Sequence, residues 1–149
     1  MKLRASAAAI GTVLVLGTTG ALALRTVAAS AHSATHTLKF VSVTNKSIML
    51  VKASGAQQDT DVNATGKTVG FDMLYFPGAS AATGTVSMTV DTIGGFLYGK
   101  LTVNFKTGAI TSGKVTGGTG AFARATGTIK AKNLNAAGIR TAVTITYSG

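Results

Sequence analysis

Apolar and polar residues alternate with a period of two along most of the chain after residue 36. The clearest stretch covers residues 85–91, where Val86, Met88 and Val90 fall on one face and polar residues fall on the other. Because successive side chains of a β-strand point to opposite faces, this pattern predicts a half-buried strand. After residue 31, no stretch carries an apolar stripe at helical spacing over three turns. The pattern therefore favours a domain built from strands.

The same alternation predicts eight strands joined by turns. Residues 37–43 and 47–52 are predicted to form a hairpin around a tight turn at Asn45-Lys46. Residues 53–65 hold little that could be buried, so we predict a long loop there, either a lid over a site or a mobile connection. The six remaining strands are predicted at residues 68–76, 85–91, 96–105, 109–116, 128–134 and 140–147.

Short, evenly spaced strands with turn residues between them are typical of an all-β barrel or sandwich. An eight-stranded antiparallel β-barrel leaves no open edge, which suits a chain that has no cysteine and therefore no disulfide. The lumen of such a barrel is filled by side chains or holds one small ligand.

The first part of the chain has the pattern of a secretory signal peptide. Lys2 and Arg4 precede a mostly small and apolar stretch over residues 7–24, and Ala29-Ser30-Ala31 provides a small-residue cleavage site. We expect cleavage before His32, with a cut before Leu24 or an uncut anchor as alternatives. This predicts a secreted protein with a signal peptide over residues 1–31 and one domain over residues 32–149.

Composition excludes several kinds of chemistry. The absence of cysteine excludes thiol catalysis, Cys-ligated metals and iron–sulfur clusters, and the chain has no glutamate. Both histidines lie in the lead-in to the first strand without a third ligand, so no metal site is expected. The predicted mature chain carries a net charge of +7 from dispersed basic residues. Solvated faces and attraction to an anionic cell-wall polymer or lipid head groups are expected, and no nucleic-acid groove.

A glycine-rich corner separates the strands predicted at residues 109–116 and 128–134. Its sequence, Gly117-Gly118-Thr119-Gly120-Ala121-Phe122 followed by Ala125-Thr126-Gly127, resembles a signature of the allene oxide cyclase / dirigent superfamily. Val69-Gly70 and Met88-Thr89-Val90 extend the likeness, which covers residues 68–147. With its leader, the chain most resembles the bacterial, secreted allene oxide cyclase barrel-like proteins.

This resemblance implies an eight-stranded antiparallel barrel, often a homotrimer, with an apolar lumen open at one end. It implies a small apolar ligand, a lipid or a phenolic, whose cyclisation or radical coupling is steered without metal or cofactor. Two departures bear on activity. Thr126 stands where plant dirigent proteins usually have an arginine, and the glutamate that the cyclases use in the lumen is absent. Neither plant activity is therefore carried over.

Asp72 is the candidate catalytic residue. It shares a strand face with Gly70, Leu74 and Phe76, and an apolar lumen would raise the pKa of its carboxyl and suit it to act as a general base. The alternative is a rim position where Asp72 is solvated or paired with a lysine. Five aromatic residues are candidates for substrate binding, with a subunit interface or core packing as alternatives: Phe71, Tyr75, Phe76, Phe96 and Tyr98.

These observations together predict a secreted, cofactor-free barrel that binds a small apolar molecule in its lumen. If the barrel is an enzyme, a cofactor-independent isomerase or cyclase is expected. A non-catalytic carrier and a structural, wall-associated barrel remain as alternatives.

Overall fold

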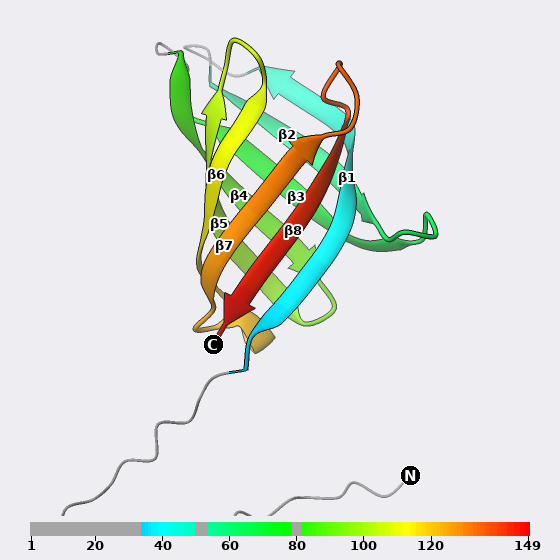
Figure 1. Cartoon of the computed structure of the whole chain (residues 1–149), viewed down its shortest axis with the longest axis vertical. Coiled ribbons are helices and arrows are strands. Elements are labelled where there is room, and N and C mark those ends of the chain that lie inside the picture. The colour runs from blue at the N-terminus through cyan, green and yellow to red at the C-terminus, as the bar shows by residue number, and fades with distance from the viewer. Residues whose placement is uncertain (1–33, 50–53, 79–81) are drawn as a thin grey trace, which may run out of the picture. The chain divides into compact units, whose positions relative to one another are not determined.

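The computed structural model describes residues 34–49, 54–78 and 82–149 (Figure 1). The predicted signal peptide and both of its cleavage sites lie outside these residues, as do the last residues of the strand predicted at 47–52. Among the described residues, no helix is long and apolar enough to cross a membrane.

The described residues form a closed antiparallel β-barrel in which each strand pairs with the next along the chain and the last pairs with the first (Figure 1). This confirms the predicted all-β, eight-stranded fold. The strands are β1 (His36–Met49), β2 (Gly55–Val62), β3 (Thr68–Phe76), β4 (Thr83–Thr92), β5 (Gly95–Asn104), β6 (Ala109–Gly118), β7 (Thr126–Asn133) and β8 (Arg140–Ser148), and a 3-10 turn, η2 (Gly120–Phe122), lies between β6 and β7.

Alternate residues of each strand fill the barrel. On β4, Val86, Met88 and Val90 are buried, as the alternation predicts. Leu97 on β5 and Ile145 on β8 are completely buried in the same core. Burying such aliphatic side chains contributes roughly 1.5–3 kcal/mol each, which supplies the stability that disulfides give to many small secreted domains.

The hairpin predicted at the start of the domain is wrong. β1 is one strand, with a bulge between Thr44 and Lys46 where the turn was expected. The Nδ2 of the extra residue, Asn45, donates a hydrogen bond to Thr60 on β2. A polar Asn-Lys pair suits either a turn or a bulge, and only the pairing with β2 selects the bulge.

The long loop predicted over residues 53–65 is also wrong in its larger part. β2 occupies this segment and pairs with β1 on one side and with β3 on the other. Its inward positions Gln57, Asp59 and Asp61 are polar. The only large apolar residue anywhere in β2 is Val62. The count of eight strands was correct because one strand was split in the prediction and another was missed.

The glycine-rich corner separates β6 from β7, as predicted, and it also packs against the end of the barrel. Gly117 and Gly120 have positive φ values of 141° and 56°, which favour glycine. A Cβ on Gly118 would come within 2.3 Å of the Phe96 carbonyl oxygen. Phe122 of η2 is buried and meets Tyr147 edge-on at 5.4 Å between ring centroids. The corner lies at the end of the barrel near the C-terminus (Figure 1).

Candidate functional site

Three of the four aspartates of the chain lie inside the barrel and form the acid cluster, defined as Asp59 and Asp61 on β2 with Asp72 on β3. Their exposed fractions are 2%, 1% and 2%. The strand register places Asp59 directly opposite Asp72. Asp61 lies opposite Ser42 of β1 and Gly70 of β3. Side chains directly or diagonally across a strand pair are within reach of one another, so the three carboxyl groups share one environment.

Asp59 is the member of the cluster that receives hydrogen bonds from neutral donors. The hydroxyl of Ser42 donates to Asp59 Oδ2 at 2.7 Å, and the amide of Gln57 donates to the same oxygen at 2.8 Å. The Gln57 amide also donates to the hydroxyl of Thr44 at 3.0 Å. β1 and β2 therefore hold the Asp59 carboxylate in a fixed position.

Asp61 and Asp72 have raised pKa values. Burial raises the pKa of Asp61 to about 9, and repulsion from Asp72, a shared proton with Asp72 and repulsion from Asp59 add to the effect. Burial also raises the pKa of Asp72 to about 6. Hydrogen bonds from Asp61 and from the hydroxyl of Ser42 oppose this rise, and repulsion from Asp59 adds to it. At neutral pH one proton is therefore held on Asp61 and shared with Asp72, as in other pairs of close carboxyl groups.

The acid cluster has no cationic partner within the part of the chain that the structure describes. Apart from the proton that Asp61 and Asp72 share and the Ser42 hydroxyl near Asp72, the carboxyl oxygens of these two residues and Oδ1 of Asp59 have no hydrogen-bond partner there. No basic side chain contributes to either pKa shift. The rim position, with Asp72 solvated or paired with a lysine, is therefore not what the structure shows. In the same described residues, no three His, Cys, Asp or Glu side chains are arranged to hold a metal ion.

An inner cavity of about 30 Å³ adjoins Asp59 and Asp72. Ser42, Gln57 and Thr141 add polar groups to its wall, and Leu74, Met88 and Leu101 are among its apolar lining residues. This volume is enough for about one or two water molecules. The carboxyl of Asp72 thus meets a small space that is polar on one side and apolar on the other.

A larger pocket lies at the mouth of the barrel, next to the inner cavity. This mouth pocket has a volume of about 300 Å³, and its lining includes Met49, Gly55, Gln57, Phe76 and Phe105. The rings of Phe76 and Phe105 lie 6.4 Å apart between centroids. Because Gln57 lines both the mouth pocket and the inner cavity, its side chain separates a largely apolar opening from the acid cluster.

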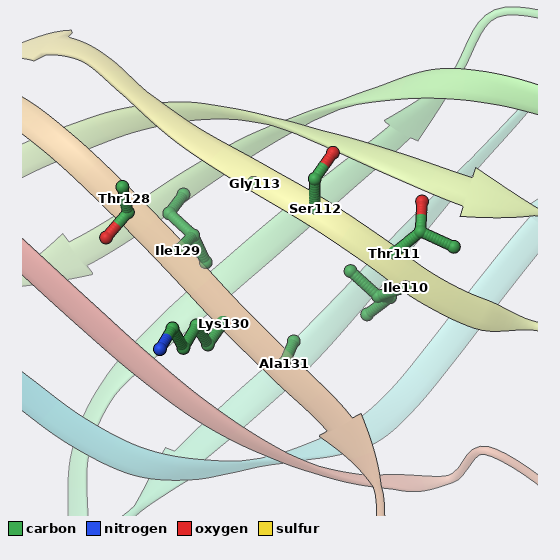
Figure 2. Close-up of a pocket in the computed structure, with 8 residues that line it drawn as sticks. All are labelled: Ile110, Thr111, Ser112, Gly113, Thr128, Ile129, Lys130 and Ala131. Carbon is green, nitrogen blue, oxygen red and sulfur yellow. The ribbon is translucent and has the colours of Figure 1, made fainter.

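A second opening lies in the wall between β6 and β7, which pair at only two positions, Lys114 with Thr128 and Val115 with Gly127. A slot of about 420 Å³ separates the other halves of these strands (Figure 2). Figure 2 shows Ile110 of β6 and Ala131 of β7 at one end of the slot, and these two residues also line the inner cavity.

The structure separates the residues that the sequence singled out. Asp72 lies in the acid cluster, and Phe76 lines the mouth pocket on the same inward face. The remaining four candidates for substrate binding are exposed on the outside of β3 and β5: Phe71, Tyr75, Phe96 and Tyr98. The structure does not bring these four to the lumen, and a subunit interface, the other exposed role considered for them, stays a prediction.

Sequence reasoning missed most of the site. Ser42, Gln57, Asp59 and Asp61 were not identified, because three of them fall in the segment predicted as a loop and Ser42 lies in a strand that was noted for its apolar residues. One signal was present. Polar residues recur at Gln57, Asp59 and Asp61 with the period of a strand, although apolar residues usually mark the inward face.

No family model and no curated protein matches the sequence. Among solved structures, the barrel is similar to one described as pyocyanin demethylase, with a TM-score of 0.55 and 16% sequence identity. The match covers 76% of this chain and 100% of that one. At this level of identity the similarity concerns the fold alone.

Proposed function

We propose that the protein is a small-molecule barrel of the allene oxide cyclase / dirigent kind in which Asp72 transfers protons to and from a largely apolar ligand. The observation that carries this proposal is the position of Asp72, buried beside the inner cavity with a pKa of about 6 and no cationic partner among the described residues. A carboxylate with this pKa is ionised at neutral pH and is a stronger base than an exposed aspartate.

The proposed reaction is an isomerisation or cyclisation that needs no cofactor. Asp72 takes a proton from one atom of the ligand, exchanges it with solvent, and returns a proton to another atom, so no oxidant or reductant is consumed. Asp61 holds a second proton next to Asp72 and stabilises its ionised form through their hydrogen bond. In the ligand-free protein, Ser42 and Gln57 hold the carboxyl of Asp59 in place beside Asp72.

The mouth pocket is the proposed place of binding. Its volume of about 300 Å³ lies at the lower end of the range for small-molecule sites, whereas the inner cavity is too small for an organic ligand. Phe76 and Phe105 offer aromatic surface to a lipid or a phenolic. The side chain of Gln57 has to turn aside for the ligand to meet Asp72.

Two further features support the proposal without testing it. The glycine-rich corner carries the resemblance to the superfamily, and the structurally similar pyocyanin demethylase acts, by its name, on the small molecule pyocyanin. Export, assembly as a homotrimer and attraction to an anionic wall polymer belong to the same proposal. The leader sequence supports export. The exposed aromatic residues of β3 and β5 support a homotrimer, and the net charge of +7 after cleavage supports attraction to an anionic polymer.

The small inner cavity favours a second candidate function. A lumen filled by side chains at this level suits a structural, wall-associated barrel or a carrier that uses only the mouth pocket. Proton transfer to or from a bound ligand would distinguish the proposed enzyme from a carrier or a structural barrel.

The test uses the chain from residue 32 onward, incubated in D₂O with 1-phenylpropan-2-one, an apolar aromatic ketone whose C–H groups beside the carbonyl are acidic enough for a carboxylate base to exchange. Native mass spectrometry measures binding, and mass spectrometry of the recovered probe measures deuterium incorporated at carbon. We expect binding by wild type and by Asp72→Asn, with deuterium incorporation lost in Asp72→Asn and kept in Asp91→Asn. Asp91 is an exposed aspartate, so this control changes the charge equally. If wild type binds the probe but incorporates no deuterium, the protein is a carrier. If wild type does not bind the probe, the structural barrel is favoured.

A further inference from the structure

A third pocket opens on the side of the acid cluster that the mouth pocket does not reach. β1 pairs with β2 only from Val41 onward, because β2 ends at Val62. The first residues of β1 therefore have a strand partner on the β8 side alone. A pocket of about 370 Å³, here called the side pocket, lies at this place between β1 and the facing ends of β3 and β4.

Asp61 is the buried polar group in the lining of the side pocket. Leu38, Phe40 and Val90 give the pocket apolar walls. The lack of a side chain at Gly70 leaves room beside the carboxyl of Asp61, since a Cβ there would lie 3.5 Å from Asp61 Oδ2. Asp61 is 1% exposed, and apart from the proton shared with Asp72 its oxygens have no hydrogen-bond partner in the described residues. This is a polar group without a full set of partners at an apolar pocket.

We propose that the side pocket binds a small organic cation, a primary ammonium group on an apolar body, with the ammonium paired to Asp61. Three buried carboxyl groups without a basic partner favour a cation over an anion or a neutral ligand. An ammonium group donates up to three hydrogen bonds and so satisfies acceptor oxygens that the described residues leave unpaired. Phe40 and Leu38 contact the apolar body.

Other ligand classes fit the side pocket less well. A divalent metal ion needs several oxygen ligands at close range, and no group of three suitable side chains is so arranged in the described part of the chain. Lys39 lines the pocket and attracts anions, but its residue is exposed whereas the acid cluster is buried. An anion at the buried end of the pocket would meet repulsion from Asp72, which is ionised at neutral pH and lies beside Asp61, and burial leaves this interaction screened least.

When the cation binds, its ammonium group replaces the proton on the carboxyl of Asp61. Asp61 holds its proton at neutral pH, and pairing with the ammonium makes the ionised form the stable one, so a proton is released to solvent. The charged and titratable groups around Asp61 are Asp59 on β2, Asp72 on β3 and Lys39 on β1. Ser42 of β1 lies opposite Asp61, and Thr37 of β1 and Thr92 of β4 add hydroxyl groups to the lining of the side pocket. The affinity should then rise with pH by up to about tenfold per unit between pH 6 and 8.

This inference does not rest on the proposed function. The mouth pocket does not include Asp61, and the side pocket does not include Asp72. Failure to detect proton transfer to a ligand at the mouth pocket would therefore not count against cation binding at the side pocket, and failure to detect cation binding would not count against the proton transfer.

The experiment is isothermal titration calorimetry of the chain from residue 32 onward with phenethylammonium chloride, in two buffers of different ionisation enthalpy. The difference in heat counts the protons released. 2-Phenylethanol serves as the neutral probe of the same shape, and calcium chloride tests for a metal site. We expect wild type and Asp91→Asn to bind the ammonium with release of close to one proton at pH 7. We expect Asp61→Asn to bind at least tenfold more weakly and to release none.

Several outcomes overturn the proposal. These are equal affinity for 2-phenylethanol, tighter binding of calcium that Asp61→Asn abolishes, unchanged affinity in Asp61→Asn, or no binding of the ammonium by wild type. Should Asp61→Asn fail to fold, Leu38→Ala replaces it. This variant should weaken the ammonium without changing the proton count, and a wild-type count of zero is by itself enough to reject the pairing with Asp61.

Discussion

At the scale of single residues, the acid cluster consists of three buried aspartates that have no cationic partner among the described residues. A carboxylate in an apolar interior loses its hydration, and it responds by keeping its proton or by gathering hydrogen-bond donors. Asp61 keeps its proton at neutral pH, and Asp59 accepts hydrogen bonds from Ser42 and Gln57. Asp72 lines the inner cavity, and its pKa of about 6 lets its carboxyl gain or lose a proton near neutral pH.

The hydroxyl of Ser42 is predicted to stabilise the fold through Asp59. Ser42→Ala removes the donor at 2.7 Å from a buried carboxyl and should lower the free energy of unfolding by about 1–3 kcal/mol. Ser87→Ala is the control, because Ser87 is exposed on β4, and it should change stability by less than about 0.5 kcal/mol. Urea denaturation followed by circular dichroism measures both. Equal stability of the two variants would show that the Asp59 carboxyl gains nothing from this bond.

At the scale of elements, β2 and the glycine-rich corner show two ways in which a short segment shapes the barrel. β2 carries the acid cluster on its inward face, and its end at Val62 leaves the first residues of β1 unpaired on one side. The corner brings η2 against the end of the barrel, where Phe122 packs on Tyr147. The side pocket thus exists because β2 ends at Val62. The barrel end near the C-terminus is covered because the 3-10 turn η2 packs against it.

Two neighbouring glycines of the corner should respond differently to alanine. In Gly118→Ala the new Cβ would approach the backbone oxygens of Phe96 and Phe122, which cannot move aside, so we expect a loss of about 1–3 kcal/mol. Gly117 has open space around it, and Gly117→Ala should cost only the backbone strain of its φ of 141°, about 1 kcal/mol. Thermal melts of both variants decide the order. A larger loss in Gly117→Ala would mean that backbone strain outweighs packing here.

At the scale of the whole molecule, the folded barrel binds protons more tightly than the unfolded chain. The pKa of Asp61 rises from 3.8 to about 9 on folding, and that of Asp72 rises from 3.8 to about 6. Between these values the unfolded chain has lost protons that the folded chain still holds. The free energy of unfolding therefore falls as pH increases, by up to about 1.4 kcal/mol per unit for each proton.

The melting temperature of the chain from residue 32 onward should accordingly be higher at pH 5 than at pH 8. Scanning calorimetry across this range measures it. Asp61→Asn removes the group with the larger shift and should flatten the profile, whereas Asp91→Asn should leave it unchanged. A melting temperature that rises steadily with pH in wild type would mean that the buried acids are ionised in the folded state.

The sequence alone determined the fold class. The alternation along residues 85–91 and 140–147 shows which side chains share a strand face, because a strand has a strict period of two, while the structure shows which of the two faces is inward. The glycines of the corner mark the break between β6 and β7. Asp72 was identified for the same reason, since it stands on an otherwise apolar face.

Only the tertiary structure decided which segments pair and what surrounds Asp72. The identity of β2 as a strand depends on its hydrogen bonds to β1 and β3, since its own residues have little tendency to form one. The bulge in β1 depends on the same pairing. Asp59 and Asp61 become a site only because the register brings them beside Asp72, and a register is a relation between strands that no single stretch of sequence contains.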